Sequence, residues 1–172
     1  MRPIQMTASA TPLYAPGRST FRLGVAWLLM CAALALHVTD EALTGFLAVY
    51  NPTVLAMPAK LGFWPMPTFE FREWLTGLVI GILLLSALSP FAFRNARSIR
   101  PVFYFCAVVT GLLNALGHTI AAILGHTVAA VRFPRPAPGF YSSPVLLIAS
   151  IYLLVQLRRT RPRTSYDVSS EV

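Results

Sequence analysis

Four long apolar runs dominate the chain, and polar segments rich in proline or arginine separate them. The runs extend from about 21 to 50, 73 to 93, 101 to 131 and 140 to 157. A helix of roughly 20 apolar residues spans a bilayer, so each run has the length of a transmembrane helix, and the first and third exceed it. The pattern predicts an all-α membrane protein built as a bundle of four transmembrane helices.

The segment between the first two runs has a different character. Asn51-Pro52 marks the predicted end of the first helix, because an interior proline removes a backbone hydrogen bond. Residues 53–72 then combine prolines with phenylalanine and tryptophan. Aromatic residues are typical of membrane interfaces, so we expect an interfacial loop or a short helix here. In the second run, Gly77 and Gly81 form a GxxxG pattern, which favours close packing of helices.

The polar ends and the arginines set the expected topology. Residues 1–20 and 158–172 lack an apolar period and are predicted to be disordered tails around a transmembrane domain of residues 21–157. Four spans place both tails on one side of the membrane. That side carries ten of the 14 Lys and Arg residues, and the other side carries four. An excess of positive charge marks the cytoplasmic side, so both termini are predicted to be cytoplasmic.

Composition supports the membrane assignment and removes one other class of function. Hydrophobic residues make up 56% of the chain and charged residues 12%, against about 25% charged in soluble domains. A net charge of +8 suggests nucleic acid in a soluble chain, but these arginines flank apolar runs, so no nucleic-acid partner is expected. Cys31 and Cys106 lie within apolar runs and are predicted to be buried, unpaired hydrophobes.

Ionisable side chains interrupt the first apolar run at His37, Asp40 and Glu41. Spacings of three and four residues place all three on one face of a helix, which Thr44 extends. Two adjacent carboxylates inside a membrane cost several kcal/mol unless a cation or a protonated group accompanies them. This pattern favours a functional cluster over hydrogen bonding that only joins helices.

The third apolar run carries a second polar face. Asn114 and His118 lie four residues apart on a stripe of small or polar residues that is predicted to pack against other helices. The stripe comprises Gly111, Asn114, His118, Ala121 or Ala122, and Gly125. His126 lies eight residues beyond His118, and the sequence does not decide whether it belongs to the cluster or to the interface.

The two polar faces are predicted to lie at the same depth. Both helices run outward from the cytoplasmic side, and His37 lies roughly 22 Å of helical rise from the start of the first. His118 lies roughly 25 Å from the start of the third. We therefore expect one site between two helices in the outer half of the membrane. Pro138-Gly139 begins the fourth helix on that side and is placed to close the mouth of the site.

Three motifs in this order resemble the HXXEE-motif family of small bacterial integral membrane proteins, whose function is uncharacterised. They are His37-Val-Thr-Asp40-Glu41, Asn114-Ala-Leu-Gly-His118 and Pro138-Gly139-Phe-Tyr-Ser142. Asp40 stands where the family pattern has Glu, and Ser142 where it has Thr. The resemblance covers residues 22 to 157. It implies a shared site and a location in the bacterial inner membrane, but no reaction.

The chemistry of the cluster predicts a metal-dependent membrane enzyme. His37, Glu41 and His118 are the expected ligands of a divalent cation, zinc or iron. Asp40, Glu41 and Asn114 are the expected catalytic or substrate-contacting groups, acting on bound water or on a lipid-like or small hydrophobic substrate. Besides the substrate, the surrounding bilayer is the expected partner. The sequence does not distinguish a hydrolase from an oxidoreductase.

Three other functions remain open at this stage. The cluster could be a proton relay or a cation site in a small transporter, which four spans would complete only as an oligomer. His37 and His118 could hold a haem between them. The chain could also be a structural membrane protein in which the cluster only fixes helix packing.

Overall fold

The computed structural model describes residues 17–133 and 135–160, and that part of the chain is helical without a β-strand. A 3₁₀ turn, η1, and a π-helical segment, η2, accompany the α-helices. The elements are α1 (Arg18–Thr44), α2 (Leu47–Ala56), α3 (Pro58–Leu61), α4 (Phe71–Ala87), α5 (Ser89–Phe93), η1 (Arg97–Ile99), α6 (Arg100–Phe105), η2 (Cys106–Leu113), α7 (Asn114–Leu124) and α8 (Ser143–Arg159).

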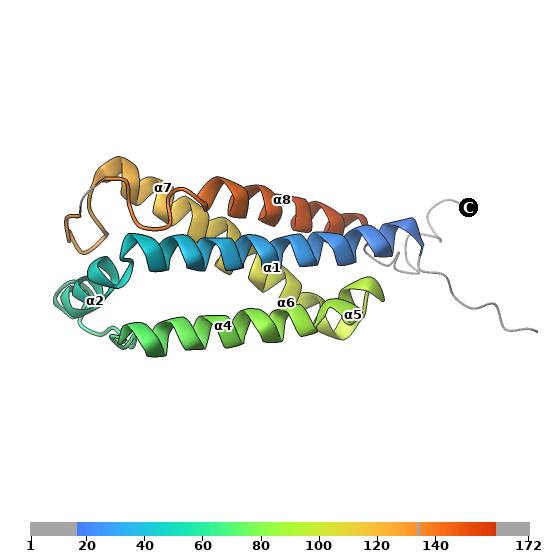
Figure 1. Cartoon of the computed structure of the whole chain (residues 1–172), viewed down its shortest axis with the longest axis horizontal. Coiled ribbons are helices and arrows are strands. Elements are labelled where there is room, and N and C mark those ends of the chain that lie inside the picture. The colour runs from blue at the N-terminus through green and yellow to red at the C-terminus, as the bar shows by residue number, and fades with distance from the viewer. Residues whose placement is uncertain (1–16, 134, 161–172) are drawn as a thin grey trace, which may run out of the picture.

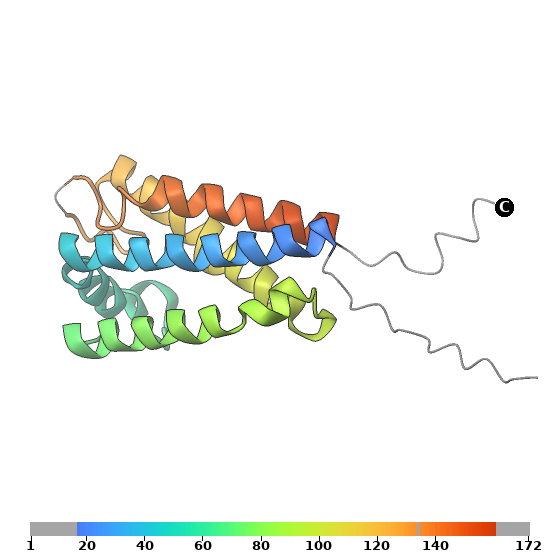
Figure 2. The same cartoon turned by 45° about the vertical axis from the view of Figure 1, so that its right-hand side comes forward.

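Three helical stretches are long and apolar enough to cross a membrane, namely Arg18–Thr44, Phe71–Phe93 and Arg97–Leu124. The remaining long helix, α8, has 17 residues and lies along α1. In Figures 1 and 2, α1 runs through the middle of the molecule, with α8 on one side and α4 on the other. The predicted all-α fold is confirmed, with three helices long and apolar enough to cross a membrane, and a bundle of four transmembrane helices stays a prediction.

The core lies between α1, α8 and the helix formed by α6, η2 and α7. Trp27 of α1 and Phe103 of α6 are fully buried, with ring centroids 4.4 Å apart. At Gly111, a Cβ atom would lie 1.9 Å from a serine hydroxyl of α8, so the absence of a side chain permits this close contact. The predicted packing at Gly111 is confirmed. Cys31 and Cys106 are buried and unpaired, as expected.

The helix α4 packs much more loosely than α1. Half of the apolar window of α1 is buried, against 6% for the span that contains α4, and Trp74 is the buried residue of α4. Cβ atoms added at Gly77 and Gly81 would meet no atom within 4 Å. Among the described residues of this chain, the GxxxG pattern therefore does not bring helices together. Both glycines line a cavity instead.

Two predicted helix ends are wrong. The first helix ends at Thr44 rather than at residue 50, because Gly45 takes a left-handed φ of 78°. A separate helix, α2, follows and includes Pro52, which was expected to stop the chain's helical path. The third helix ends at Leu124 rather than at residue 131, because Gly125 has a φ of 75°. Left-handed glycines terminate helices by capping their last carbonyl groups.

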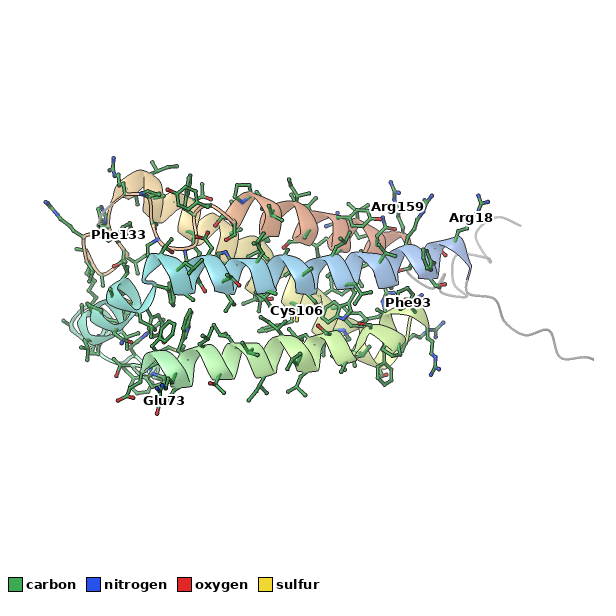
Figure 3. All side chains as sticks on the ribbon, viewed as in Figure 1. Arg18, Glu73, Phe93, Cys106, Phe133 and Arg159 are labelled. Atoms are coloured by element: carbon green, nitrogen blue, oxygen red, sulfur yellow. The ribbon has the colours of Figure 1, made fainter. Side chains whose placement is uncertain are left out.

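The ends of the bundle agree with the sequence more closely. The short helix α3 lies in the segment where an interfacial loop or helix was expected. The predicted tails lie mostly outside the described residues, although α1 begins at Arg18 and α8 extends to Arg159, slightly beyond the expected domain limits. Figure 3 shows Arg18 and Arg159 at one end of the molecule, and Glu73 and Phe133 at the other.

Candidate metal centre

His37 and Glu41 of α1 and His118 of α7 form one compact group. The Glu41 Oε1 atom lies 3.1 Å from His118 Nε2 and 3.6 Å from His37 Nε2. His37 is fully buried and Glu41 is 5% exposed. One potential ligand atom from each of the three residues lies within 4.8 Å of the others, so the group could hold a metal ion. The predicted meeting of the two polar helix faces is confirmed.

The loop before α8 closes this group from one side. Gly139 has a φ of 77°, and a Cβ atom there would lie 2.9 Å from His37 Cε1, 3.0 Å from Glu41 Cγ and 3.0 Å from His118 Cε1. Its backbone N–H donates to Thr44 Oγ1 over 3.3 Å. Only glycine fits this position, which places the backbone directly against all three side chains. The predicted covering of the site by Pro138-Gly139 is confirmed.

Hydrogen bonds at Ser142 determine which nitrogen of His37 carries the proton. The Ser142 hydroxyl lies 2.8 Å from Asp40 Oδ2, 3.2 Å from Gly139 O and 2.8 Å from His37 Nδ1. Its two oxygen neighbours can only accept, so the hydroxyl donates to one of them and accepts the Nδ1–H of His37. The Nε2 atom of His37 therefore carries a lone pair.

A backbone carbonyl group orients the imidazole of His118 in the way that Ser142 orients that of His37. Its Nδ1 atom bonds to the carbonyl oxygen of Pro138, which can only accept, so Nδ1 carries the proton. In a neutral His118 the Nε2 atom then carries the lone pair, and this atom lies beside Glu41. Metal-ligating histidines are commonly held this way, with the second nitrogen bonded to a carbonyl or a carboxylate-linked group.

When both imidazoles are neutral, the two Nε2 atoms and the Glu41 carboxylate converge as three electron-rich groups. The Nε2 atom of His37 is buried and makes no hydrogen bond within the described part of the chain. An unsatisfied buried polar atom is costly and calls for an explanation. A cation shared by the two imidazoles and the carboxylate supplies one.

Two of the three distances in the group suit a small tetrahedral ion, and the widest, up to 4.8 Å, would have to shorten on binding. Zinc bonds to nitrogen and oxygen of about 2.0–2.2 Å, at the tetrahedral angle, separate ligand atoms by roughly 3.3 Å. The two distances from Glu41 Oε1, 3.1 and 3.6 Å, lie on either side of that value. Three protein ligands leave a fourth position open, which is the arrangement of catalytic rather than structural zinc sites.

The other predicted site residues take different positions. Asp40 directs its carboxylate away from the group and accepts the backbone N–H and hydroxyl of Ser142, each over 2.8 Å. Asn114 makes no side-chain hydrogen bond to the described residues. His126 is exposed, lies outside the group and donates to the carbonyl oxygen of Thr127. Catalytic roles for Asp40, Glu41 and Asn114 stay predictions.

Sequence reasoning did not assign the role of Ser142. The only signal was its place in the Pro-Gly-x-x-Ser motif, and nothing along the chain indicated that its hydroxyl links His37 to Asp40. The π-helical segment η2, which ends directly before Asn114, was also not expected. Segments of this kind occur frequently at functional sites.

Two cavities flank the group, and Asn114 lines both. One, of about 230 Å³, lies toward the loops and includes Tyr50, Thr127 and His118 in its wall. The other, of about 400 Å³, lies between α1, α4 and η2 and has His37 and Glu41 in its wall. The group therefore lies between a loop-side cavity and one among the long apolar helices.

Comparison of the chain with protein-family models, curated proteins and solved structures found no match. The resemblance to the HXXEE-motif family accordingly stays a prediction. The case for a functional centre rests on the geometry of the group and on its two cavities.

Proposed function

We propose that this protein is a metal-dependent enzyme of the membrane, with His37, Glu41 and His118 holding a zinc or iron ion. The observation that carries the proposal is the fully buried Nε2 atom of His37, which has no hydrogen-bond partner and lies beside a carboxylate oxygen and a second imidazole. A divalent cation satisfies all three groups at once.

The proposed topology has four spans, with α8 as the fourth and both termini in the cytoplasm. The arginines at the Arg18 and Arg159 end support this orientation through the positive-inside rule. The centre then lies in the outer half of the bilayer, beneath the loop that holds Gly139. The resemblance to the HXXEE-motif family supports a location in the bacterial inner membrane.

The residues around the proposed metal ion have different roles. The metal, when bound, supplies a Lewis acid that can activate water or polarise a substrate oxygen. Ser142, backed by Asp40, holds the imidazole of His37 in the ligating tautomer, and the Pro138 carbonyl does the same for His118. Asn114 has a free side-chain amide beside both cavities, where it can bind a substrate head group. Zinc would favour hydrolysis, and iron oxidative chemistry.

Metal analysis of the full chain, purified in detergent, tests the proposal. We expect about one zinc or iron ion per chain and its loss in both His37→Ala and His118→Ala, because each variant removes one of three ligands. His126→Ala is the matched control, since this third histidine lies outside the group. A well-folded wild-type protein that binds no divalent metal after zinc or iron is added would refute the proposal.

The short Glu41–His118 distance supports a second candidate, a proton relay. One proton shared between Glu41 Oε1 and His118 Nε2, 3.1 Å apart, would also stabilise these two groups. Proton uptake into vesicles that Glu41→Gln abolishes, in a metal-free protein, would favour it. Neutral replacements at Asp40 and Glu41 that leave stability unchanged or improved would instead favour a structural role.

A haem between the two histidines fits less well. The Glu41 carboxylate contacts both Nε2 atoms, which is where the iron of a bis-histidine haem must lie. The visible absorption spectrum of the purified protein checks this directly.

A further inference from the structure

The cavity between α1, α4 and η2 has the form of a chain-binding site that ends at the candidate metal centre. It holds about 400 Å³, and eight of its 12 lining residues are glycine or aliphatic. Its apolar wall comprises Leu34, Val38, Gly77, Leu78, Gly81, Ile82, Leu85 and Val109. His37 and Glu41 form a polar patch in this wall, together with Thr110 and Asn114.

The cavity opens among the membrane-spanning helices rather than at their ends. Gly77 is exposed and Val109 is 42% exposed, so the opening lies between the middle of α4 and η2. Both segments belong to stretches apolar enough to cross a membrane. In Figure 1, the helix that begins at α6 near α5 runs behind α1 and away from α4 toward α7. A molecule that enters here comes from the bilayer.

Two independent features indicate that the cavity receives a ligand. Gly77 and Gly81 leave it open, because neither approaches another helix. The fully buried Nε2 atom of His37 lacks a hydrogen-bond partner, and His37 is part of the cavity wall. An apolar tunnel that leads to an unsatisfied polar group suits a ligand with a long apolar part and a polar end.

We propose that this cavity binds the hydrocarbon chain of a single-chain lipid, such as a fatty acid or a fatty alcohol, with its oxygen-bearing head group against His37 and Glu41. That the lipid head group binds a metal ion rests on the proposed function, whereas the binding of the hydrocarbon chain in the cavity does not. The loop-side cavity, which Asn114 also lines, gives water a separate approach to the same head group.

The volume of the cavity fits one hydrocarbon chain rather than two. An apolar cavity of about 150 Å³ accommodates benzene, which corresponds to roughly 25 Å³ for each carbon. At that rate the 400 Å³ cavity holds on the order of 15 carbons. Leucines at both glycine positions would add eight side-chain carbons and fill about half of the space.

A photoreactive fatty acid tests this assignment on the full chain in lipid nanodiscs. The probe is palmitic acid with a diazirine in the middle of its chain, and mass spectrometry locates the label. We expect labelling at Val38, which is 4% exposed and therefore shielded from bulk lipid. Excess unlabelled palmitate should compete it away. Label on Leu83 and Leu84, each 64% exposed, should resist competition because it comes from the surrounding bilayer.

The variants sharpen the test. Gly77→Leu/Gly81→Leu should lower the label at Val38 by about tenfold or more, because the two leucine side chains occupy about half of the space that the lipid chain needs. Leucine is also a better helix former than glycine, so α4 should remain folded. Thr76→Leu is the matched control, because Thr76 is an exposed residue of α4 outside the cavity wall, and it should keep the wild-type label.

The outcomes separate this inference from the proposed function. Absent or non-competable label at Val38, or label unchanged in the double glycine variant, overturns the chain-binding cavity even where metal is bound. Competition by a two-chain phospholipid as strong as that by palmitate overturns the restriction to a single chain. Competable label at Val38 in a protein that binds no metal supports the cavity and refutes only the metal.

Discussion

Removing the hydroxyl of Ser142 tests whether the hydrogen bonds around the centre serve metal binding. In Ser142→Ala the Nδ1 atom of His37 loses its 2.8 Å partner, while Asp40 keeps the backbone N–H of residue 142. The carboxylate thus stays hydrogen-bonded, and the change falls mainly on the imidazole. Its proton is then free to move to Nε2, which blocks the ligating lone pair.

The magnitude follows from what such bonds contribute in each role. Groups that orient a metal-ligating histidine typically change metal affinity by 10- to 100-fold, or about 1.4–2.7 kcal/mol. A hydrogen bond that only joins membrane helices averages about 0.6 kcal/mol of stability. The two roles therefore predict different quantities: a large loss of metal affinity, or a small loss of stability with metal affinity intact.

Ser143→Ala is a matched control for this experiment. Ser143 is 1% exposed, and its hydroxyl donates to the Gly139 carbonyl over 2.8 Å, but it does not contact His37. Competition with a chelator of known zinc affinity gives the dissociation constant of each variant. We expect Ser142→Ala to bind at least tenfold more weakly, Ser143→Ala to resemble wild type and Ser142→Thr to restore binding. Equal zinc affinities in Ser142→Ala and Ser143→Ala would refute the tautomer argument.

Two further predictions concern the loop and the metal. Gly139→Ala should weaken zinc binding by more than about tenfold, because a Cβ atom there lies within about 3 Å of all three ligand side chains. Gly45→Ala is the control, since Gly45 has a similar left-handed φ but open space around it. It should show only the backbone strain, roughly 1–2 kcal/mol of stability in thermal unfolding. Metal removal by a chelator should lower the unfolding temperature, since an ion at a concentration 100 times its dissociation constant contributes about 2.7 kcal/mol of stability. The same chelator should not shift the unfolding temperature of His118→Ala. An unchanged unfolding temperature in the wild-type protein would contradict a bound ion.

The apolar runs and their polar faces were enough to predict that His37 and His118 meet. Helical spacing fixes which residues share a face, and a constant rise per residue places them at comparable depth. Neither inference depends on the details of packing. The prediction therefore survived the wrong end of the first helix, because the break at Gly45 lies beyond the whole His37–Glu41 stretch.

The glycines could not be interpreted from the chain alone. Gly111 allows a close helix contact, Gly125 ends a helix, and Gly81 opens a cavity. The same residue type serves all three because glycine permits both close approach and positive φ. The choice depends on which surface faces the glycine, and that is decided by the tertiary structure. For this reason the GxxxG pattern alone did not show that Gly77 and Gly81 face a cavity within this chain.

Helix geometry also explains how two adjacent carboxylates come to face different neighbours. Glu41 lies four residues after His37 and reaches the same side of α1, where it faces His118. Asp40 is rotated by about 100° from Glu41, because an α-helix has 3.6 residues per turn, and it faces the loop before α8. There Ser142 supplies two donors to Asp40.

Each carboxyl group thus contacts a different set of groups, so the two do not compete for one cation. Asp40 acts on the centre only through the Ser142 hydroxyl, and its shorter side chain matches a loop drawn close by Gly139. Lengthening it in Asp40→Glu would push against that loop unless the partner at residue 142 moved as well. Asp40 and Ser142 therefore belong to one interaction, and the effects of Asp40→Glu and of a change at Ser142 are expected to be non-additive.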